Sequence, residues 1–305
     1  MGCVISLEIY FFIHNKNMTY FLKKGDTTLV DTIPGVLWAG LYSIAHSKGS
    51  IMDFVKSYMA TKDVYWLVLP TDGEILSNQV DPIIKQNGIS KEEKLIVMTL
   101  SQKTEDPSLH YFYMPLDDTI FSKGLKNIIT NLPPWESRSS VDFGRGGCSG
   151  GGMESVRCRT VAKLIDQPLC DVKLSRWWSE NKNIPDNYFA DRVPPEVFLN
   201  YKIFFIIDGN CIASNHMWGF ATGCVPFILS NAKCWFLEFV EPWKHYIPVE
   251  YDLSDLVQLI EWVRTHDEEA RCIAERALQF SNEYFSSEFQ KKYITTKLDD
   301  IISKL

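Results

Sequence analysis

The chain has 305 residues, about twice the size of a common single domain, so its length favours two domains of roughly 150 residues each. Apolar residues make up 46% of the chain and charged residues 23%, a balance that supports packed cores and excludes a largely disordered protein. The formal net charge is −7 and no run of five Lys or Arg occurs, which excludes the clustered basic face of a nucleic-acid-binding protein.

The N-terminus raises the question of membrane attachment. The apolar run Cys3–Ile13 is too short to span a bilayer, and it lacks the basic start and the cleavage site of a signal peptide. The opening residues, from Met1 through Gly2 and Cys3 to Ser6, fit the N-myristoylation pattern, with Cys3 as a palmitoylation candidate. An opening β-strand, or a translation start at Met18, is the alternative interpretation.

Helical and strand patterns alternate along the chain, which favours an α/β fold. In the N-terminal half we expect two helices within Ile33–Met59 and buried parallel strands at Val64–Leu69 and Leu95–Leu100. The polar, Pro-containing stretch Leu132–Ser140 is the best candidate for a linker.

The C-terminal half contains a glycine cluster at Gly144–Gly152, followed by an expected helix from Met153 to Leu164. Apolar runs predict strands at Ile203–Ile207 and Cys224–Leu229. A further helix is expected to end at Thr265, with Asp252 or Ser254 as its cap, and two more helices complete the chain. None of the eight cysteines has C-x-x-C spacing, so we expect buried free thiols and no zinc site.

The glycine cluster lets the backbone approach a ligand closely, and it leads into a helix whose N-terminal N–H groups favour an anion. Arg145, Arg157 and Arg159 supply planar guanidinium groups suited to a diphosphate. The cluster matches neither the P-loop nor the dinucleotide-binding pattern. A flexible surface loop beside an exposed helix is the alternative.

Asp72 and Asp208 each follow an apolar strand, where open α/β sheets bind ligands. Each could be a general base, a ribose contact or a turn-forming residue. His245, between aromatic neighbours, could be a ligand contact or a packed side chain. No Asp-x-Asp triplet occurs in the sequence, so no metal site is predicted.

Three segments, Tyr201–Asn210, Gly223–Leu229 and Pro242–Val249, resemble glycosyltransferase family 90, which contains capsule-associated xylosyltransferases and Rumi-type protein O-glucosyltransferases. The likeness continues through Asp252–Leu256 and later helical segments. Upstream, Arg145-Gly146, Ser149-Gly150-Gly151 and Arg157-Cys158-Arg159 resemble the family's Arg-Gly…Thr-Gly-Gly…Arg-x-Arg pattern. These segments cover about half the chain. More weakly, Asp63–Asp72 looks like the strand that leads to the family's catalytic aspartate.

The resemblance implies a GT-B fold, in which two Rossmann-like domains face a central cleft. We expect an acceptor-side domain at residues 1–132, a UDP-sugar-binding domain at 133–284, and a C-terminal helix at 285–305 packing back on the first domain. The implied reaction is inverting, metal-independent transfer of xylose or glucose from UDP-xylose or UDP-glucose to a hydroxyl of a glycan or glycoprotein, without a cofactor.

The resemblance also implies roles for individual residues. Asp72 is the expected general base. The expected donor-binding residues are Arg145, Gly146, Ser149, Gly150, Arg157, Arg159, Asp208, Ser214, Asn215, His245 and Asp252. Family relatives of the secretory pathway carry signal sequences, and no signal-peptide pattern is recognised in this sequence. A cytoplasmic location is therefore expected, with acylation at Gly2 and Cys3 as a route to the membrane surface.

Two departures from the family pattern keep alternatives open. Where the family has Ser-x-Arg after Asp-Gly-Asn, this chain has Ala213-Ser214-Asn215, which removes an arginine expected to contact the diphosphate, so the remaining arginines or His216 must compensate. Cys234 stands where a glutamate is common, which leaves the choice between xylose and glucose open. The alternatives are a UDP-sugar-binding or glycan-binding protein without catalysis and, from Gly2 and Cys3 alone, an acylated membrane-surface scaffold.

Overall fold

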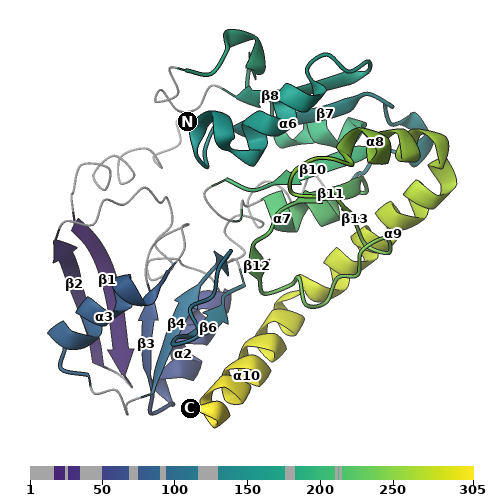
Figure 1. Ribbon diagram of the computed structural model, residues 1–305. Coiled ribbons are helices and arrows are strands. Elements are labelled where there is room, and N and C mark those ends of the chain that lie inside the picture. The colour runs from purple at the N-terminus through teal and green to yellow at the C-terminus, as the bar shows by residue number, and fades with distance from the viewer. Residues whose placement is uncertain are drawn as a thin grey trace, which may run out of the picture. The chain divides into compact units, whose positions relative to one another are not determined.

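The computed structural model describes residues 17–24, 27–34, 50–68, 75–89, 94–115, 130–175, 183–209, 212 and 215–305 (Figure 1). Gly2, Cys3, Asp72 and Ser214 lie outside these residues. The chain divides into two compact units. Unit 1 comprises Met1–Thr119, Lys233–Trp235 and Gln290–Leu305, and unit 2 comprises Ile120–Ala232 and Phe236–Phe289. Both units contain helices and strands among the described residues, so the predicted α/β class is confirmed.

Unit 1 contains a mixed five-stranded sheet with the order β2-β1-β3-β4-β6. The strands β3 (Tyr65–Val68), β4 (Leu95–Thr99) and β6 (His110–Tyr113) are parallel, which confirms the two strands expected in this half. β1 (Asn17–Lys24) pairs antiparallel with both β3 and β2 (Thr27–Pro34). Only two residues separate β1 from β2, and so short a connection joins antiparallel strands only.

The predicted beginning of a helix at Ile33 is wrong, because Ile33 and Pro34 form the end of β2. Most of the residues before them, Thr27–Thr32, are β-branched, and among the described strands β2 has a partner on one side only, where a missing N–H is tolerated. The second expected helix is confirmed as α2 (Ser50–Ala60). Its fully buried residues are spaced by four, as an amphipathic helix requires: Ile51, Val55 and Met59.

Two more helices pack in unit 1. α3 (Ser77–Gln86) buries Val80 and Ile83 against the parallel strands. α10 (Ser287–Lys304) buries Tyr293, whose ring centroid lies 5.9 Å from that of Phe112 on β6. Unit 1 also contains a short antiparallel ladder between β5 (Ser101–Gln102) and β12 (Lys233–Cys234).

Unit 2 contains two three-stranded parallel sheets. One has the order β7-β8-β9, with β7 (Asp142–Gly147), β8 (Cys170–Ser175) and β9 (Phe189–Ala190). The other has the order β10-β11-β13, with β10 (Ile203–Ile207), β11 (Val225–Leu229) and β13 (Ile247–Pro248). Both strands predicted in this half are therefore confirmed.

These two sheets meet at β7 and β10. A parallel bridge joins Ser139 to Tyr201 just before the two strands, and the Lys202 N–H donates to the Ser139 carbonyl at 3.3 Å. The combined order is β9-β8-β7-β10-β11-β13. If these six strands are numbered 1 to 6 along the chain, the order is 3-2-1-4-5-6. This is the strand order of doubly wound nucleotide-binding sheets, and its switch point lies between β7 and β10.

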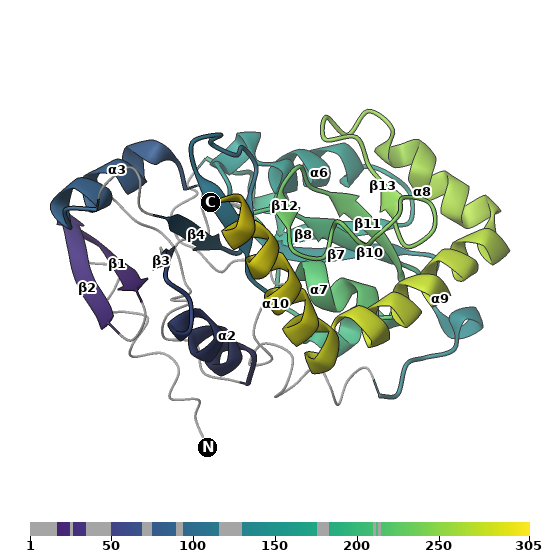
Figure 2. The same cartoon turned by 90° about the horizontal axis from the view of Figure 1, so that it is seen from below.

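Helices cover both faces of the strands of unit 2. Figure 2 shows α6 (Val156–Leu164) and α8 (Leu256–Thr265) on one side, and α7 (Asn215–Trp218) and α9 (Asp267–Tyr284) on the other. Alternate residues of β10 meet different neighbours: Phe205 joins the core cluster that contains residues of α6, α8 and α9, whereas the Phe204 ring lies 4.6 Å from that of Trp218 on α7.

The beginning of α8 differs from the expectation. The helix begins after Asp255, so the predicted cap at Asp252 or Ser254 is wrong. Asp252 Oδ1 instead accepts from the Ser254 N–H at 2.9 Å, and Asp255 Oδ1 accepts from the Glu250 N–H at 3.0 Å. Both carboxylates therefore close the turn before the helix.

The described cysteines are free thiols, and four of them are buried, as expected: Cys148, Cys158, Cys224 and Cys234. None of the described helices is both long and apolar enough to cross a membrane.

A buried carboxylate lies at the amino end of β7. Asp142 is 2% exposed, forms an ion pair with Arg264 of α8 and accepts from the Cys170 thiol at 3.2 Å. Burial outweighs the guanidinium and raises the pKa of Asp142 to about 6.

This shift makes the stability of unit 2 depend on pH. The folded-state pKa lies above the unfolded value, so Asp142 stabilises the fold when protonated, below about pH 4, and this contribution is lost as the pH rises through 6. Between pH 4 and 7 the wild type should lose on the order of 2 kcal/mol more unfolding free energy than Asp142→Asn. Urea unfolding of both proteins across this range measures the difference, and parallel pH profiles would contradict it.

Candidate functional site

The switch point of unit 2 brings two loops together at the carboxyl ends of adjacent strands. The glycine cluster continues from β7, and Asp208-Gly209 follows β10. The chain leaves these strands towards opposite faces of the sheet, which in doubly wound folds opens a crevice for a ligand. This edge is therefore the candidate site.

The two loops touch through glycines. A Cβ atom on Gly150 would lie 2.4 Å from the Gly209 carbonyl oxygen, and one on Gly209 would lie 2.6 Å from Ser149 Oγ. Gly150 and Gly151 also have φ values of +95° and +108°, a region that side-chain-bearing residues rarely adopt. The cluster is thus required by backbone geometry and packing, which a flexible surface loop would not need.

Arg157 holds these loops in place. It lies in the first turn of α6, and its guanidinium donates to the Gly147 carbonyl at 2.8 Å, to Ser149 Oγ at 2.9 Å and to the Ile207 carbonyl at 3.2 Å. These partners come from the ends of both β7 and β10. Arg157 therefore places a permanent positive charge at the switch point, beside the N-terminus of a nine-residue helix.

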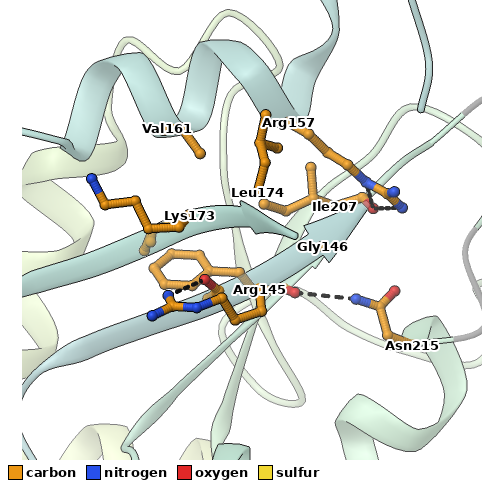
Figure 3. A pocket seen from close by; sticks show the side chains of 11 residues that line it. Arg145, Gly146, Arg157, Val161, Lys173, Leu174, Ile207 and Asn215 are labelled. Atoms are coloured by element: carbon orange, nitrogen blue, oxygen red, sulfur yellow. Dashed lines mark hydrogen bonds between the residues drawn. The ribbon is translucent and has the colours of Figure 1, made fainter. Parts of the chain in front are cut away.

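A small pocket opens beside Arg157 (Figure 3). Figure 3 shows Arg157 and Asn215 at the same end of the strands, Arg157 from α6 and Asn215 from the start of α7. Asn215 Nδ2 donates to the Phe205 carbonyl at 3.4 Å, while its Oδ1 is buried and has no hydrogen-bond partner among the described residues. The remaining lining residues are Gly144, Arg145, Gly146, Val161, Val172, Lys173, Leu174, Phe205 and Ile207.

Arg145 lines this pocket, but its guanidinium is directed elsewhere. Its Nη2 donates to both carboxylate oxygens of Asp171 at 2.9 and 2.8 Å, and the guanidinium lies 4.4 Å from the centre of the Phe143 ring. Asp171 is opposite Phe143 in the β7–β8 register, so the Arg145 side chain runs back from the carboxyl edge, as Figure 3 shows. The structure does not bring the charged groups of Arg145 and Arg157 together.

Asp208 is fully buried. Its Oδ1 lies 3.1 Å from His216 Nε2, and both side chains are 0% exposed. His216 is equally withdrawn from solvent. Neither side chain is among those that line the described pocket, so the predicted contact of Asp208 with the donor stays a prediction.

Arg159 and Asp252 meet at a neighbouring position, after the end of β13. Arg159 donates to the Tyr251 carbonyl at 3.0 Å and lies 5.4 Å from the centre of the Tyr251 ring. Hydrogen bonds from Ser254 lower the pKa of the exposed Asp252 carboxyl, and the charge of Arg159 adds to the effect. These two residues share the carboxyl edge of the sheet with Arg157 but engage different partners.

His245 lies apart from the other candidates. It precedes β13, at the amino end of that parallel strand, whereas the glycine cluster lies at the carboxyl ends. Its Nδ1 accepts from the Glu241 N–H at 3.0 Å, and its ring centroid lies 5.4 Å from that of Phe280. Burial lowers the pKa of His245. The geometry is that of the packed histidine that the sequence left as its alternative.

Sequence reasoning missed Gly209 and the Ile207 carbonyl, which contact the cluster from β10. The two-residue period of strands could have predicted the direction of the Arg145 side chain. Gly144 and Gly146 face α6, so Arg145 between them must face away.

Ser214 and Asp72 lie outside the described residues. In the part of the chain that the structure describes, no group of three His, Cys, Asp or Glu side chains could hold a metal ion.

The glycine contact can be tested with a matched pair of variants. Gly150→Ala should lower the unfolding free energy more than Gly151→Ala, because both residues have positive φ but only Gly150 faces backbone at 2.4 Å. We expect Gly151→Ala to cost about 1–2 kcal/mol from strain alone and Gly150→Ala at least about 1 kcal/mol more. Denaturant unfolding measures both, and equal losses would contradict the close contact.

Comparison with known proteins places this arrangement in a family. Residues 121–301 match the family described as Glycosyl transferase family 90. Uncharacterized protein 179R of Invertebrate iridescent virus 6 is 28% identical over 190 residues, which cover 51% of this chain and 16% of that protein. Protein O-glucosyltransferase 1 of Homo sapiens is 28% identical over 153 residues, which cover 48% of this chain and 38% of that protein.

The chain therefore aligns with less than half the length of these curated relatives. Among solved structures, Anabaena Alr3699/HepE in complex with UDP-glucose matches 82% of this chain and 76% of its own, with 10% sequence identity and a TM-score of 0.47. The family match covers more than half of the chain and the whole switch-point edge. The chain belongs to glycosyltransferase family 90.

Proposed function

We propose that the protein is a glycosyltransferase that moves a single sugar from a UDP-sugar to a hydroxyl acceptor. The observation that carries the proposal is that the family match spans the unit whose switch-point edge combines an interlocked glycine loop with Arg157. A nucleoside diphosphate suits this edge because main-chain N–H groups, a helix N-terminus and a guanidinium all favour a diphosphate.

Arg157 is the proposed cation for the leaving UDP. Negative charge develops on the diphosphate as the bond from the anomeric carbon to the phosphate oxygen breaks, and a fixed guanidinium stabilises this charge without reorganising. The Arg157 bonds to Gly147, Ser149 and Ile207 provide that fixed position. Preorganised cations can replace a metal ion in this role, so we propose a metal-independent reaction.

Asp72 is the proposed general base. It follows the apolar strand β3 in sequence, and the family resemblance assigns a catalytic aspartate to this position. The carboxylate would take the proton of the acceptor hydroxyl while that oxygen attacks the anomeric carbon and UDP leaves from the opposite side. One displacement of this kind inverts the configuration, and a general base contributes about 10²–10⁴-fold to the rate.

The sugar and the acceptor are the finer parts of the proposal. Human protein O-glucosyltransferase 1 is by name a glucosyltransferase that acts on protein, which supports glucose, and the wider family supports xylose. The acceptor is proposed to be a glycan or glycoprotein. We also propose a GT-B arrangement, with the donor bound by unit 2 and the acceptor by unit 1, because unit 2 contains the doubly wound strand order.

A second candidate function is UDP-sugar binding without catalysis. Two observations favour it: Asn215 stands at the pocket where the family has an arginine, and Arg145 is engaged by Asp171. The diphosphate would then meet fewer cations than in an active transferase. UDP would bind, while neither transfer nor donor hydrolysis would occur.

Donor hydrolysis distinguishes the two candidates. UDP release is measured across a panel of UDP-sugars with EDTA present, for the wild type and for Asp72→Asn. The transferase should release UDP from one donor, and Asp72→Asn should lower that rate by about 10²–10⁴-fold while binding UDP as before. If no UDP-sugar in the panel releases UDP although UDP itself binds, the result supports a binding protein without catalysis. Inhibition of UDP release by EDTA would contradict metal independence.

The arginines give a second test. Arg157→Lys should weaken UDP binding by about tenfold or more, because the planar, charged fork is lost at the switch point. Arg145→Lys should change UDP affinity less than about twofold, because the Arg145 guanidinium is already hydrogen-bonded to the Asp171 carboxylate. Calorimetric titration with UDP measures both variants. A larger loss in Arg145→Lys would show that Arg145 leaves Asp171 for the diphosphate.

A further inference from the structure

The pocket beside Arg157 combines cationic residues with a single side-chain acceptor. Arg145, Arg157 and Lys173 supply the cations, and none of the described lining residues is an aspartate or a glutamate. Among these described lining residues, Asn215 is the one whose side chain carries an oxygen. A ligand in this pocket therefore meets positive charge and, at Asn215, one neutral acceptor.

The orientation of the Asn215 amide follows from a hydrogen bond to β10. Its Nδ2 donates to the Phe205 carbonyl at 3.4 Å. An amide turned by 180° would bring its oxygen against that carbonyl oxygen, and two acceptors repel each other. Oδ1 therefore lies on the other side of the amide, and Figure 3 shows it turned away from the strand.

The Asn215 oxygen is a buried acceptor. Oδ1 has no hydrogen-bond partner among the described residues. A buried polar atom that is left unpaired is unfavourable, and folded proteins keep few of them, commonly where a ligand or a water molecule supplies the partner. Oδ1 therefore indicates a position in the pocket for a hydrogen-bond donor.

The neighbours of Asn215 on α7 hold it in place. His216 Nε2 lies 3.1 Å from Oδ1 of Asp208, the residue that follows β10. The Trp218 ring meets the Phe204 ring of β10 edge-on, with centroids 4.6 Å apart. α7 is thus attached at two points to β10 and its continuation, so the amide at the start of the helix is preorganised for a ligand.

The chemistry of Oδ1 excludes a phosphate as its partner. Phosphate oxygens of a nucleoside diphosphate accept hydrogen bonds, and so does an amide oxygen, so the two cannot pair. In a nucleotide sugar, the hydroxyl nearest to the diphosphate is on the sugar carbon next to the anomeric carbon. The ribose hydroxyls are one carbon or more further away. An acceptor beside Arg157, the proposed diphosphate cation, therefore suits that sugar hydroxyl.

We propose that Asn215 is a specificity-determining residue, whose Oδ1 accepts a hydrogen bond from the sugar hydroxyl next to the anomeric carbon. The inference rests on the proposed function, since it takes the ligand to be a UDP-sugar bound at Arg157. The site then selects sugars in which this hydroxyl is free, and it binds the intact nucleotide sugar more tightly than UDP. Glucose and xylose both carry the hydroxyl, so the inference does not depend on which of them is transferred.

Calorimetric titration tests the contact from both sides. Whichever of UDP-glucose and UDP-xylose binds more tightly is compared with its 2-deoxy analogue, which lacks the hydroxyl, and with UDP. The wild type should bind the UDP-sugar about tenfold more tightly than the analogue, because the analogue leaves a buried acceptor unpaired. Asn215→Leu has a side chain of similar size without an acceptor. It should bind the two within about twofold of each other, with the Kd for UDP changed less than about twofold.

Two more variants separate the acceptor from general effects on the fold. Asn215→Asp keeps an acceptor oxygen, so it should retain the preference for the hydroxyl, while its carboxylate repels the diphosphate and weakens the binding of all three ligands. This variant also provides a test if Asn215→Leu does not fold. Asn200→Leu is the control, because it changes an exposed asparagine before the amino end of β10 and should leave every Kd unchanged.

A wild type that binds the UDP-sugar no more tightly than its 2-deoxy analogue would overturn the inference, as would a preference that survives in Asn215→Leu or is lost in Asn215→Asp. Equal losses for UDP and the UDP-sugar in Asn215→Leu would assign the acceptor to the nucleoside, which also overturns it. In all these outcomes UDP still binds, so the proposed function stands. If the wild type binds neither UDP nor a UDP-sugar, the proposed function fails and the inference with it.

Discussion

Two backbones approach each other where β7 and β10 end, and the candidate site depends on this approach. Gly150 and Gly209 touch because neither has a side chain, and the Arg157 guanidinium joins the carbonyls of Gly147 and Ile207 from both strands. The parallel order of the sheet makes the approach unavoidable, since it places the ends of β7 and β10 side by side. The glycine cluster and the pocket both lie at this approach.

In both units, side chains bind backbone groups that have no strand partner. At the carboxyl end of a parallel strand the chain leaves the sheet, and its N–H and C=O groups lose their strand partners. Unit 2 satisfies them with a guanidinium and close glycine packing at the ends of β7 and β10. In unit 1 the amide of Gln102 and the carboxylate of Asp106 accept from the N–H groups of Ile75 and Ser77, at the start of α3.

The three arginines near the glycine cluster illustrate how secondary structure assigns roles. Strand alternation turns Arg145 to the face opposite α6, where Asp171 binds it. Helical spacing separates Arg157 from Arg159 by about 200°, so Arg157 meets the ends of β7 and β10 and Arg159 meets Tyr251. With a net charge of −7, the protein attracts no anion through its overall field, so local placement of each cation decides the chemistry.

The sequence by itself determined the α/β class, four buried strands, the glycine cluster and the family, because apolar runs, glycine freedom and short motifs are local properties. It did not determine the strand order of unit 2, the β1–β2 hairpin, the commitment of Arg145 to Asp171 or the place of His245. Only the tertiary structure decided these, since each depends on partners distant in sequence: 50 residues separate Arg157 from Ile207, and 27 separate Gln102 from Ile75. A hydrogen bond or a backbone contact is specified by the atoms that packing brings together, and no pattern within one segment contains that information.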